Sequence, residues 1–272
     1  MIEASQFRNG SAGRIFAIVQ RQAFLYRRTF HRWLDLFYWP IIDLVLFGFI
    51  QLYIARQPGS VSHVASFFLG AVILWDLLFR SQQAVSVGFL EDVWSRNVLN
   101  IWASPIRPAE YIAGTIVTGV IRITIGSTFA VVIARIAYHF NLFSLGIALL
   151  PLVIGLAAMG WAIGIIATGI MLRYGEGAEP LAWALGFIFQ PVSAVFYPVS
   201  VLPSVLRPIA RAVPASHAFA GLRQVLAHGG FPGREIMWTF ALDVVYLLVA
   251  SAFFSWMLRQ VRERGLLSRF GE

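Results

Sequence analysis

The sequence predicts an all-α polytopic membrane protein with six transmembrane helices, an N-terminal amphipathic interface helix and an outer re-entrant helical hairpin before the last span. Two observations predict this fold class. Hydrophobic residues make up 58% of the chain and charged residues only 12%, which is outside the usage of soluble proteins. Apolar stretches long enough to cross a bilayer also recur along the chain, separated by arginines and turn residues.

Composition also excludes several functions. All 21 residues counted as Lys plus Arg are Arg, so the chain has no Walker A motif and cannot hold ATP in that way. It has no cysteine, and its five histidines show no metal-ligand or catalytic spacing. We therefore predict no catalytic residues, no metal site and no cofactor bound by this chain. The net charge of +8 comes from arginines at membrane flanks, which favours membrane lipids over nucleic acid as the partner.

Residues 1–33 are predicted to form an amphipathic helix at the cytoplasmic interface. Apolar residues recur there every three or four positions, and most of the arginines lie off that line. The apolar positions are Phe16, Val19, Ala23, Tyr26, Phe30 and Trp33. The alternative is a simple basic anchor before the first span.

The transmembrane domain is predicted over residues 34–258. Apolar length and helix breakers place its spans at about 34–53, 63–79 with a possible extension to 87, 108–137, 142–172, 180 onward, and 235–258. Pro108 suits the first turn of the third span, and Pro191 and Pro198 interrupt the fifth. Gly160 and Gly164 in the fourth span form a G-x-x-x-G pattern, which allows close helix approach but is frequent by chance.

The arginines predict the orientation. With a cytoplasmic N-terminus, the inner segments hold about 14 arginines and the outer segments about six, so both termini face the cytoplasm of a cell inner (plasma) membrane. Residues 259–272 then form a cytoplasmic basic tail. Residues 198–230, on the outer side, are too apolar for a plain loop and are broken by three prolines. Broken helices at membrane depth survive only when packed in protein or lining a polar cavity, which predicts the re-entrant hairpin.

Two motifs resemble the ABC-2 type transporter permease family. The first runs from Phe196-Tyr-Pro198 through Leu202-Pro203 to Pro214-Ala-Ser-His217, and it matches the family's F-x-P-x-x-x-L-P and N-P-x-[T/S]-H elements. Val213 replaces the usual Asn. The second ends in Ser104-Pro-Ile-Arg-Pro-Ala-Glu-Tyr111, with Ile101 at the family's Leu position. The signature residues are thus Pro198, Pro203, Pro214 and His217.

The resemblance implies a coupling helix at about residues 90–104, which fits a cleft on a separate nucleotide-binding ATPase subunit. ATP and Mg would be held by that partner subunit, and a second permease copy or paralogue would complete a dimer. Residue periodicity agrees, because it places an apolar stripe on one short helix ended by Ser104-Pro105. The coupling residues predicted from both are Glu91, Trp94, Arg96, Val98, Ile101 and Trp102. The alternative is an interfacial helix whose Trp residues lie at headgroup level.

Four charges are predicted inside the spans, namely Asp43, Asp76, Arg122 and Asp243. A charge at the bilayer centre costs at least about 2.5 kcal/mol, so each invites a functional explanation. Arg122 and Asp243 lie at similar depths and could form a buried pair, with Asp43 or Asp76 as alternative partners. Such a pair would serve either helix packing or the conduit.

The predicted function is the permease subunit of an ATP-driven exporter whose substrate is a glycan, a lipid-linked molecule or a hydrophobic molecule. Aromatic side chains around the fourth and fifth spans could line its conduit, although ordinary membrane packing is the single explanation that the sequence favours most. They are Trp161, Trp183, Phe187, Phe189, Phe196 and Tyr197. The rival from another class is an ATP-independent channel or secondary transporter that uses the intramembrane charges as a relay.

Overall fold

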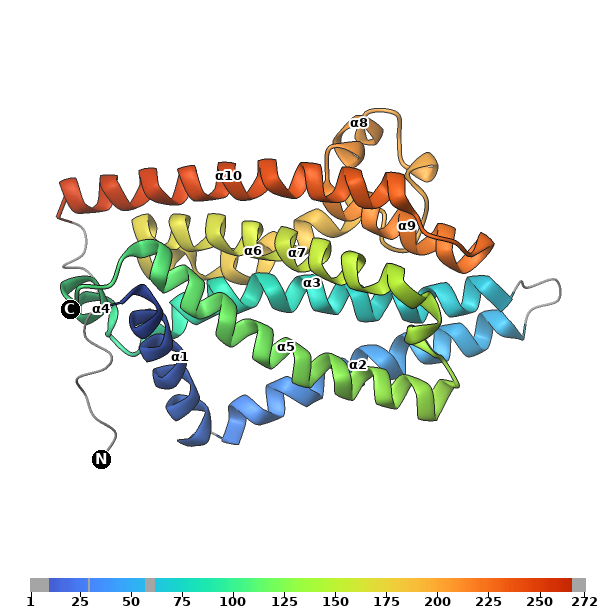
Figure 1. The fold of residues 1–272 in the computed structure, drawn as a ribbon, viewed down its shortest axis with the longest axis horizontal. Coiled ribbons are helices and arrows are strands. Elements are labelled where there is room, and N and C mark those ends of the chain that lie inside the picture. The colour runs from blue at the N-terminus through green and yellow to red at the C-terminus, as the bar shows by residue number, and fades with distance from the viewer. Residues whose placement is uncertain (1–9, 29, 57–61, 266–272) are drawn as a thin grey trace.

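The computed structural model describes residues 10–28, 30–56 and 62–265, which form helices and turns without a strand. The long helices run along a common axis, and α1 crosses it at one end (Figure 1). The α-helices are α1 Ser11–Arg28, α2 Phe30–Ala55, α3 Ser62–Trp94, α4 Val98–Ala103, α5 Pro108–Tyr138, α6 Leu149–Tyr174, α7 Glu179–Val192, α8 Leu206–Arg211, α9 Pro214–His228 and α10 Gly233–Glu263. Short 3-10 helices cover Leu142–Ala148, Gly175–Ala178 and Val199–Val201.

The all-helical membrane class is confirmed, whereas the count of six spans stays a prediction. Within the described residues, three segments are long and apolar enough to cross a bilayer: Pro108–Tyr138, Leu142–Tyr174 and Gly233–Glu263. A shorter apolar helical segment covers Phe37–Tyr53 in α2. The third predicted span begins at Pro108 as expected, because proline lacks only an N–H that the first helical turn would leave unused.

Helix α7 does not cross a bilayer by itself. Its 14 residues extend over about 21 Å at 1.5 Å per residue, against a hydrocarbon core of about 30 Å. Pro191 lies in its last turn, and the chain then turns through Val199–Val201 into α8 and α9. The predicted break in the fifth span is therefore present, and the backbone after it is irregular.

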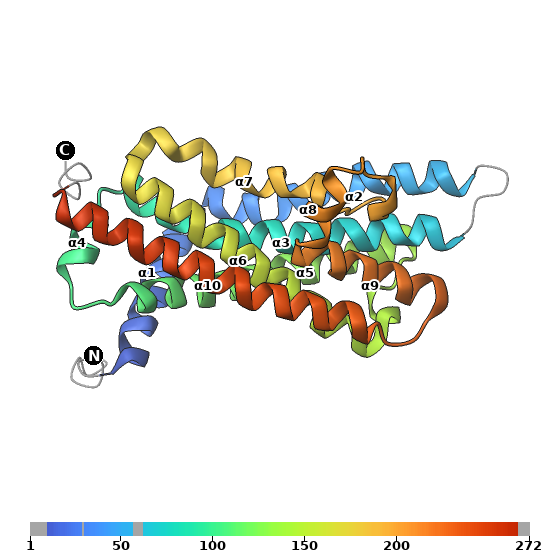
Figure 2. The same ribbon diagram turned by 90° about the horizontal axis from the view of Figure 1, so that it is seen from above.

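Helix α3 is the centre of the bundle. It packs against α2, α5, α6, α7 and α9, and every residue from 71 to 78 is buried (Figure 2). It continues without a break to Trp94, well beyond the end predicted for the second span. Its buried polar residues explain the difference, because Gln82 and Ser86 donate hydrogen bonds to the carbonyl of Ala182 in α7, at 2.7 and 3.2 Å. The donors of polar residues that resemble a loop in the sequence are thus paired inside the bundle, whereas the Gln82 Oε1 atom has no hydrogen-bond partner among the described residues.

The G-x-x-x-G pattern brings α6 against the backbone of α3. A Cβ atom at Gly164 would lie 2.5 Å from the Gln82 carbonyl oxygen, and one at Gly160 would collide with the Leu78 carbonyl oxygen. Thr168, one turn further on, donates a 3.4 Å hydrogen bond to the Val85 carbonyl. Only glycine permits this approach, which is the small-residue packing expected between membrane helices.

We predict that Gly164→Ala destabilises the protein by about 1–3 kcal/mol, because the added methyl group meets the α3 backbone, which cannot rotate away. Thermal unfolding of the purified protein in detergent would measure the loss. Gly177→Ala is the matched control, since nothing lies within 4 Å of its Cβ position. Equal melting temperatures for the two variants would contradict the role assigned to Gly164.

Candidate functional site

The turn between α3 and α4 is closed by a Schellman motif. The Asn97 N–H donates to the Asp92 carbonyl at 2.9 Å, and the Arg96 N–H donates to the Val93 carbonyl at 2.9 Å. Arg96 takes the left-handed position of the motif, with φ of 53°, where glycine is usual. Three residues are therefore enough to separate α3, which ends at Trp94, from α4, which begins at Val98.

The predicted coupling segment is consequently two helices instead of one, and the greater part of its apolar stripe is buried, whereas Trp94 is exposed. Leu90 belongs to α3, and Leu90, Val98 and Ile101 are all buried. Trp102 packs on Tyr111 at a centroid distance of 5.8 Å. The six-residue helix α4 has only two turns, so burying one face against α3 and α5 uses most of its apolar residues.

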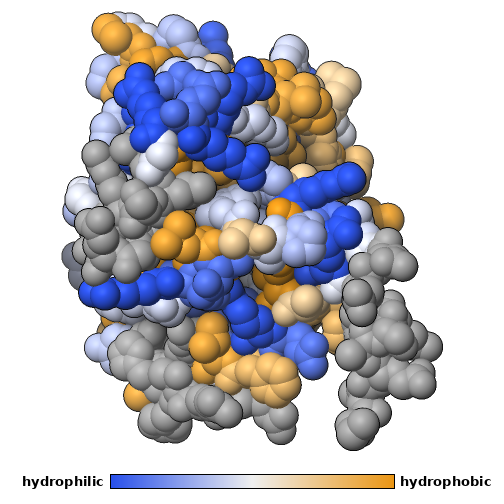
Figure 3. Space-filling model, turned by 90° about the vertical axis from the view of Figure 1, so that its left-hand side faces the viewer, coloured by the Kyte–Doolittle hydropathy of each residue, from blue (hydrophilic) through white to orange (hydrophobic). Residues whose placement is uncertain are grey.

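The exposed residues at this end of the bundle form a surface of apolar and polar side chains, which is smaller than the predicted stripe and which we call the α4 surface. It consists of the exposed residues Trp94, Ser95, Arg96, Leu99, Asn100 and Ala103. Trp94 is 50% exposed and Leu99 is 36% exposed. Figure 3 shows apolar patches between strongly hydrophilic residues at this end of the molecule. Glu91, by contrast, is half-buried on α3.

An ionic network fastens the α4 surface to α1 and α5. Asp92, which is 1% exposed, forms an ion pair with Arg21 of α1 and accepts a 2.6 Å hydrogen bond from the Tyr111 hydroxyl of α5. Arg14 of α1 donates two hydrogen bonds to the Glu110 carboxylate, at 2.7 and 2.6 Å. That carboxylate raises the pKa of the Arg14 guanidinium above its usual value. Helix α1 is therefore tied to the end of α3 and to the start of α5.

The buried face of α1 differs from the predicted one. Ile18, Gln22 and Tyr26 are buried, whereas Phe16 is 49% exposed and Ala23 is exposed. Ile18 packs against Gly114 of α5, where a Cβ atom would meet it at 2.7 Å. The predicted positions Phe30 and Trp33 lie in α2, outside the residues whose side chains are described.

The predicted Arg122–Asp243 pair is wrong. The Arg122 guanidinium lies over the Tyr26 ring at 4.6 Å, and Asp243 faces Gly155 of α6, where a Cβ atom would lie 3.4 Å from its Oδ2. Arg122 and Asp243 lie at similar depths along their helices, but their side chains contact different neighbours. Asp243 is 2% exposed, and neither carboxylate oxygen has a hydrogen-bond partner among the described residues.

The other two intramembrane acids lie near one arginine. Asp76 pairs with Arg80 one turn later on α3, at 2.6 Å, and both side chains are almost buried. Asp43 is half-buried on the neighbouring helix α2. The Asp76–Arg80 pair therefore lies within α3, in the i,i+4 arrangement that helices favour. It does not cross-link α3 to α5 or α10.

The six aromatic conduit candidates do not form one surface. Trp183 and Phe187 are exposed on α7, with Phe187 against Phe79 at a centroid distance of 4.6 Å. Phe196 is stacked between Phe47 of α2 and Phe68 of α3, at 5.2 and 6.0 Å. The remaining three are partly buried by packing or hydrogen bonding: Trp161 in both core clusters, Phe189 against Tyr246, and Tyr197 through its hydroxyl to the Pro191 carbonyl.

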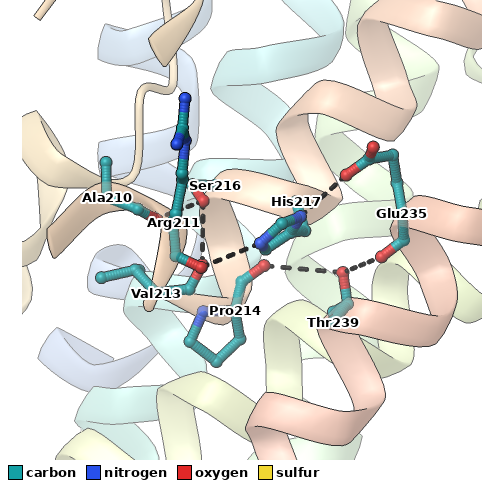
Figure 4. A network of polar contacts seen from close by, with 8 residues as sticks. All are labelled: Ala210, Arg211, Val213, Pro214, Ser216, His217, Glu235 and Thr239. Atoms are coloured by element: carbon teal, nitrogen blue, oxygen red, sulfur yellow. Dashed lines mark hydrogen bonds and ion pairs between the residues drawn. The ribbon is translucent and has the colours of Figure 1, made fainter. Parts of the chain in front are cut away.

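Two of the four family-signature residues, Pro214 and His217, lie where α9 meets α10 (Figure 4). Pro214 is the first residue of α9, and its carbonyl accepts a 3.5 Å hydrogen bond from Thr239 of α10. His217 Nδ1 lies 2.8 Å from a Glu235 carboxylate oxygen, and its Nε2 lies 3.0 Å from the Arg211 carbonyl. Because both ring nitrogens face acceptors, both bonds form together only with a second proton on the ring or a proton on Glu235.

Side chains also satisfy the irregular backbone between α7 and α9. Arg223 donates to the Ala194 carbonyl at 2.9 Å, and Arg207 donates to the Leu202 and Ser200 carbonyls at 2.8 Å each. Ser216 donates to the Ala210 carbonyl at 2.5 Å. Pro198 precedes the turn Val199–Val201, and Pro203 follows it. These donors would supply the partners that water cannot give if the segment lies within the membrane, as the predicted re-entrant hairpin requires.

Several of these residues were not identified from the sequence as a site. Glu235 and Thr239 of the signature network, and the pairing of Arg14, Arg21, Glu110, Asp92 and Tyr111, join positions separated by 18 to 96 residues. The one usable signal was the position of Asp92 beside the predicted coupling stripe. Pairing partners at such separations cannot be assigned from one sequence.

The all-helical fold, with its long apolar helices, is that of a polytopic membrane protein. A family model described as ABC-2 family transporter protein matches residues 47–258, and the chain belongs to that family. It is therefore an ABC transporter permease component, which has no ATPase of its own and works with an ATPase subunit. A comparison with curated proteins gave no match.

We predict that His217 and Glu235 are energetically coupled. In a double-mutant cycle with His217→Ala and Glu235→Gln, the coupling free energy should be about 1 kcal/mol, because each side chain is largely shielded from solvent. Denaturation of the four variants in detergent measures it. His228→Ala is a matched control on the same helix, exposed and without such a bond within the described residues. Strict additivity of the His217 and Glu235 losses would show that the pair contributes nothing.

Proposed function

We propose that the chain is the transmembrane subunit of an ATP-driven ABC-2 type exporter that works as a dimer with separate ATPase subunits. The observation that carries the proposal is the α4 surface. It lies directly at the end of α3, the helix that packs against most of the bundle. A push on this surface would therefore be transmitted along α3 to its neighbours instead of being absorbed by a loose loop.

The ionic network supports transmission through α1 as well. Arg21 and Tyr111 hold Asp92 at the end of α3, and Arg14 holds Glu110 at the start of α5. Three helices would thus move together when an ATPase subunit presses on α4. Charged groups with this little exposure are costly to separate, since each would be left without a partner.

The exposed surface is suited to a protein partner. Trp94 and Leu99 supply apolar area, and Arg96 and Asn100 supply hydrogen-bond donors around it. Interfaces commonly combine a Trp anchor with Arg, and both residue types are enriched among binding hot spots. The α4 end would face the cytoplasm, in agreement with the excess of arginines predicted for that side.

The conduit would lie between two permease copies, along the side of the bundle that carries α2 and α7 (Figure 2). Trp183 and Phe187 of α7 and Trp39 and Phe49 of α2 are all exposed in the single chain. Their rings would suit the substrate classes inferred from the sequence: a glycan, a lipid-linked molecule or a hydrophobic molecule. The rival relay loses its proposed Arg122–Asp243 pair, and membership of an ABC transporter family favours ATP as the energy source.

The test of ATPase docking is Trp94→Ala. We expect roughly tenfold weaker binding of the ATPase subunit and a matching loss of ATP-driven transport, because truncation removes a central aromatic anchor. Co-purification and titration of the ATPase subunit would measure it. Trp39→Ala is the matched control for ATPase binding alone, since Trp39 is similarly exposed, at 55% against 50%, but belongs to the proposed conduit and not to the α4 surface. Unchanged binding and transport in Trp94→Ala would rule out this docking surface.

The topology has its own test, because the native chain has no cysteine. Single cysteines at Ser204 and Ala227 should react with an impermeant reagent from the outer side, and one at Ala103 only after the cytoplasmic side is opened. All three positions are exposed, whereas Ser216 is buried and unsuitable. If Ser204 and Ala227 labelled from opposite sides, the segment between them would cross the membrane and the re-entrant hairpin would be wrong.

A further inference from the structure

A small pocket lies at the α4 end of the bundle, between the last turns of α10 and the first residue of α5. Its volume is about 250 Å³, and its lining is Pro108, Ser255, Leu258, Arg259, Arg262 and Glu263. Ligand pockets usually measure about 300–1,000 Å³, so this one suits a headgroup whose hydrocarbon chains remain outside. Neither the α4 surface nor the hairpin network includes these lining residues.

The position of the pocket corresponds to the boundary between hydrocarbon and water. The apolar part of α10 ends at Leu258, and Arg259 is its first cationic residue on that side. Trp256 is 48% exposed one turn away, and the Arg173 guanidinium lies 6.0 Å from its ring. Exposed Trp next to Arg at a helix end is typical of the headgroup level.

The charges in the pocket are not neutralised by the protein. Arg259 and Arg262 are one helical turn apart, and within residues 62–265 neither guanidinium forms an ion pair or a hydrogen bond. The Arg262 guanidinium lies over the Trp102 ring at 5.9 Å, a contact that leaves its N–H groups available. Glu263 is the acidic residue of the lining, so the three side chains carry a net charge of +1.

We propose that this pocket binds the phosphate of an anionic phospholipid headgroup through Arg259 and Arg262. Guanidinium groups bind phosphate oxygens with paired N–H donors, and the net charge of the pocket complements a single negative charge. Leu258 supplies apolar contact where the glycerol and the first methylenes would lie. Basic pockets between membrane helices at the cytoplasmic side are a known class of lipid site. The inference needs α10 to cross the membrane, but it does not depend on ATPase docking.

Occupancy of the pocket would also affect α4. Arg262 donates toward the phosphate and at the same time lies over Trp102, whose ring packs on Tyr111 of the ionic network. A bound headgroup would hold the Arg262 side chain against α4. The lipid would therefore act as a structural ligand of the α4 end.

The probe is phosphatidylglycerol, with phosphatidylcholine of the same acyl chains as the uncharged comparison. Native mass spectrometry of the purified, delipidated chain would measure binding of each lipid. We expect preferential binding of phosphatidylglycerol by the wild type. Each of Arg259→Gln and Arg262→Gln should weaken it roughly fivefold, because a basic residue near an anionic lipid surface contributes about 1 kcal/mol.

Arg264→Gln is the matched control, since Arg264 is an exposed arginine at the end of the same helix that does not line the pocket. It should leave the affinity unchanged. Arg259→Gln serves as the primary variant, because Arg262 also contacts Trp102 and its loss could disturb folding. Circular dichroism of each variant would confirm that it is folded.

Three results would overturn the proposal. Equal binding of the two lipids by the wild type would show that the pocket does not select an anionic headgroup. An equal loss in Arg264→Gln and Arg259→Gln would mean general attraction to the basic end of the protein. Unchanged phosphatidylglycerol binding in Arg259→Gln, with weaker recovery of the ATPase subunit or of a second permease copy, would assign the pocket to that protein instead.

Discussion

The contact on which the rest of the structure depends is the backbone approach of α6 to α3. Gly160 and Gly164 remove the side chains that would hold these helices apart, and the carbonyl groups of Leu78 and Gln82 occupy the space. Between membrane helices there is little hydrophobic gain from association, so close packing and interhelical hydrogen bonds must supply the stability. With α6 in place, α3 is enclosed, and α7, α9 and α10 pack around the pair.

Enclosing α3 has a consequence for its polar residues. Gln82 and Ser86 are fully buried, and they are tolerated because α7 presents the Ala182 carbonyl to both. At the end of the same helix, Asp92 is matched by Arg21 and Tyr111. The Gln82 amide nitrogen and the Asp92 carboxylate, both on α3, are thus paired with elements that come before and after it in the chain. Such bonds specify one arrangement of the helices, because any register shift would leave a buried polar group without its partner.

The sequence predicted the helices better than it predicted their contacts. Apolar length and a proline at the first turn were enough for α5, and Pro191 and Pro198 were enough for the break after α7. The end of α3 was missed because Gln82 and Ser86 resemble loop residues until α7 is present. The Arg122–Asp243 pair failed because depth along a helix does not give the face on which a side chain lies. Leu90, Val98 and Ile101 of the coupling stripe are buried for a related reason, since periodicity cannot distinguish a face that docks on a partner from one that packs inside the bundle, and coupling itself stays a prediction.

The segment between α7 and α9 shows how a chain can be irregular and yet fixed. Its carbonyl groups are bonded by Arg223, Arg207 and Ser216, whose hydrogen bonds would all have to break before the segment could change shape. Bending within the segment is therefore costly, and displacement of α8 and α9 as a unit would break the contacts of α9 to α3, α6 and α10. The connection from α9 to α10 is different, because Gly229 and Gly230 both have positive φ and open space around them, so a change in the angle between these two helices would be absorbed there.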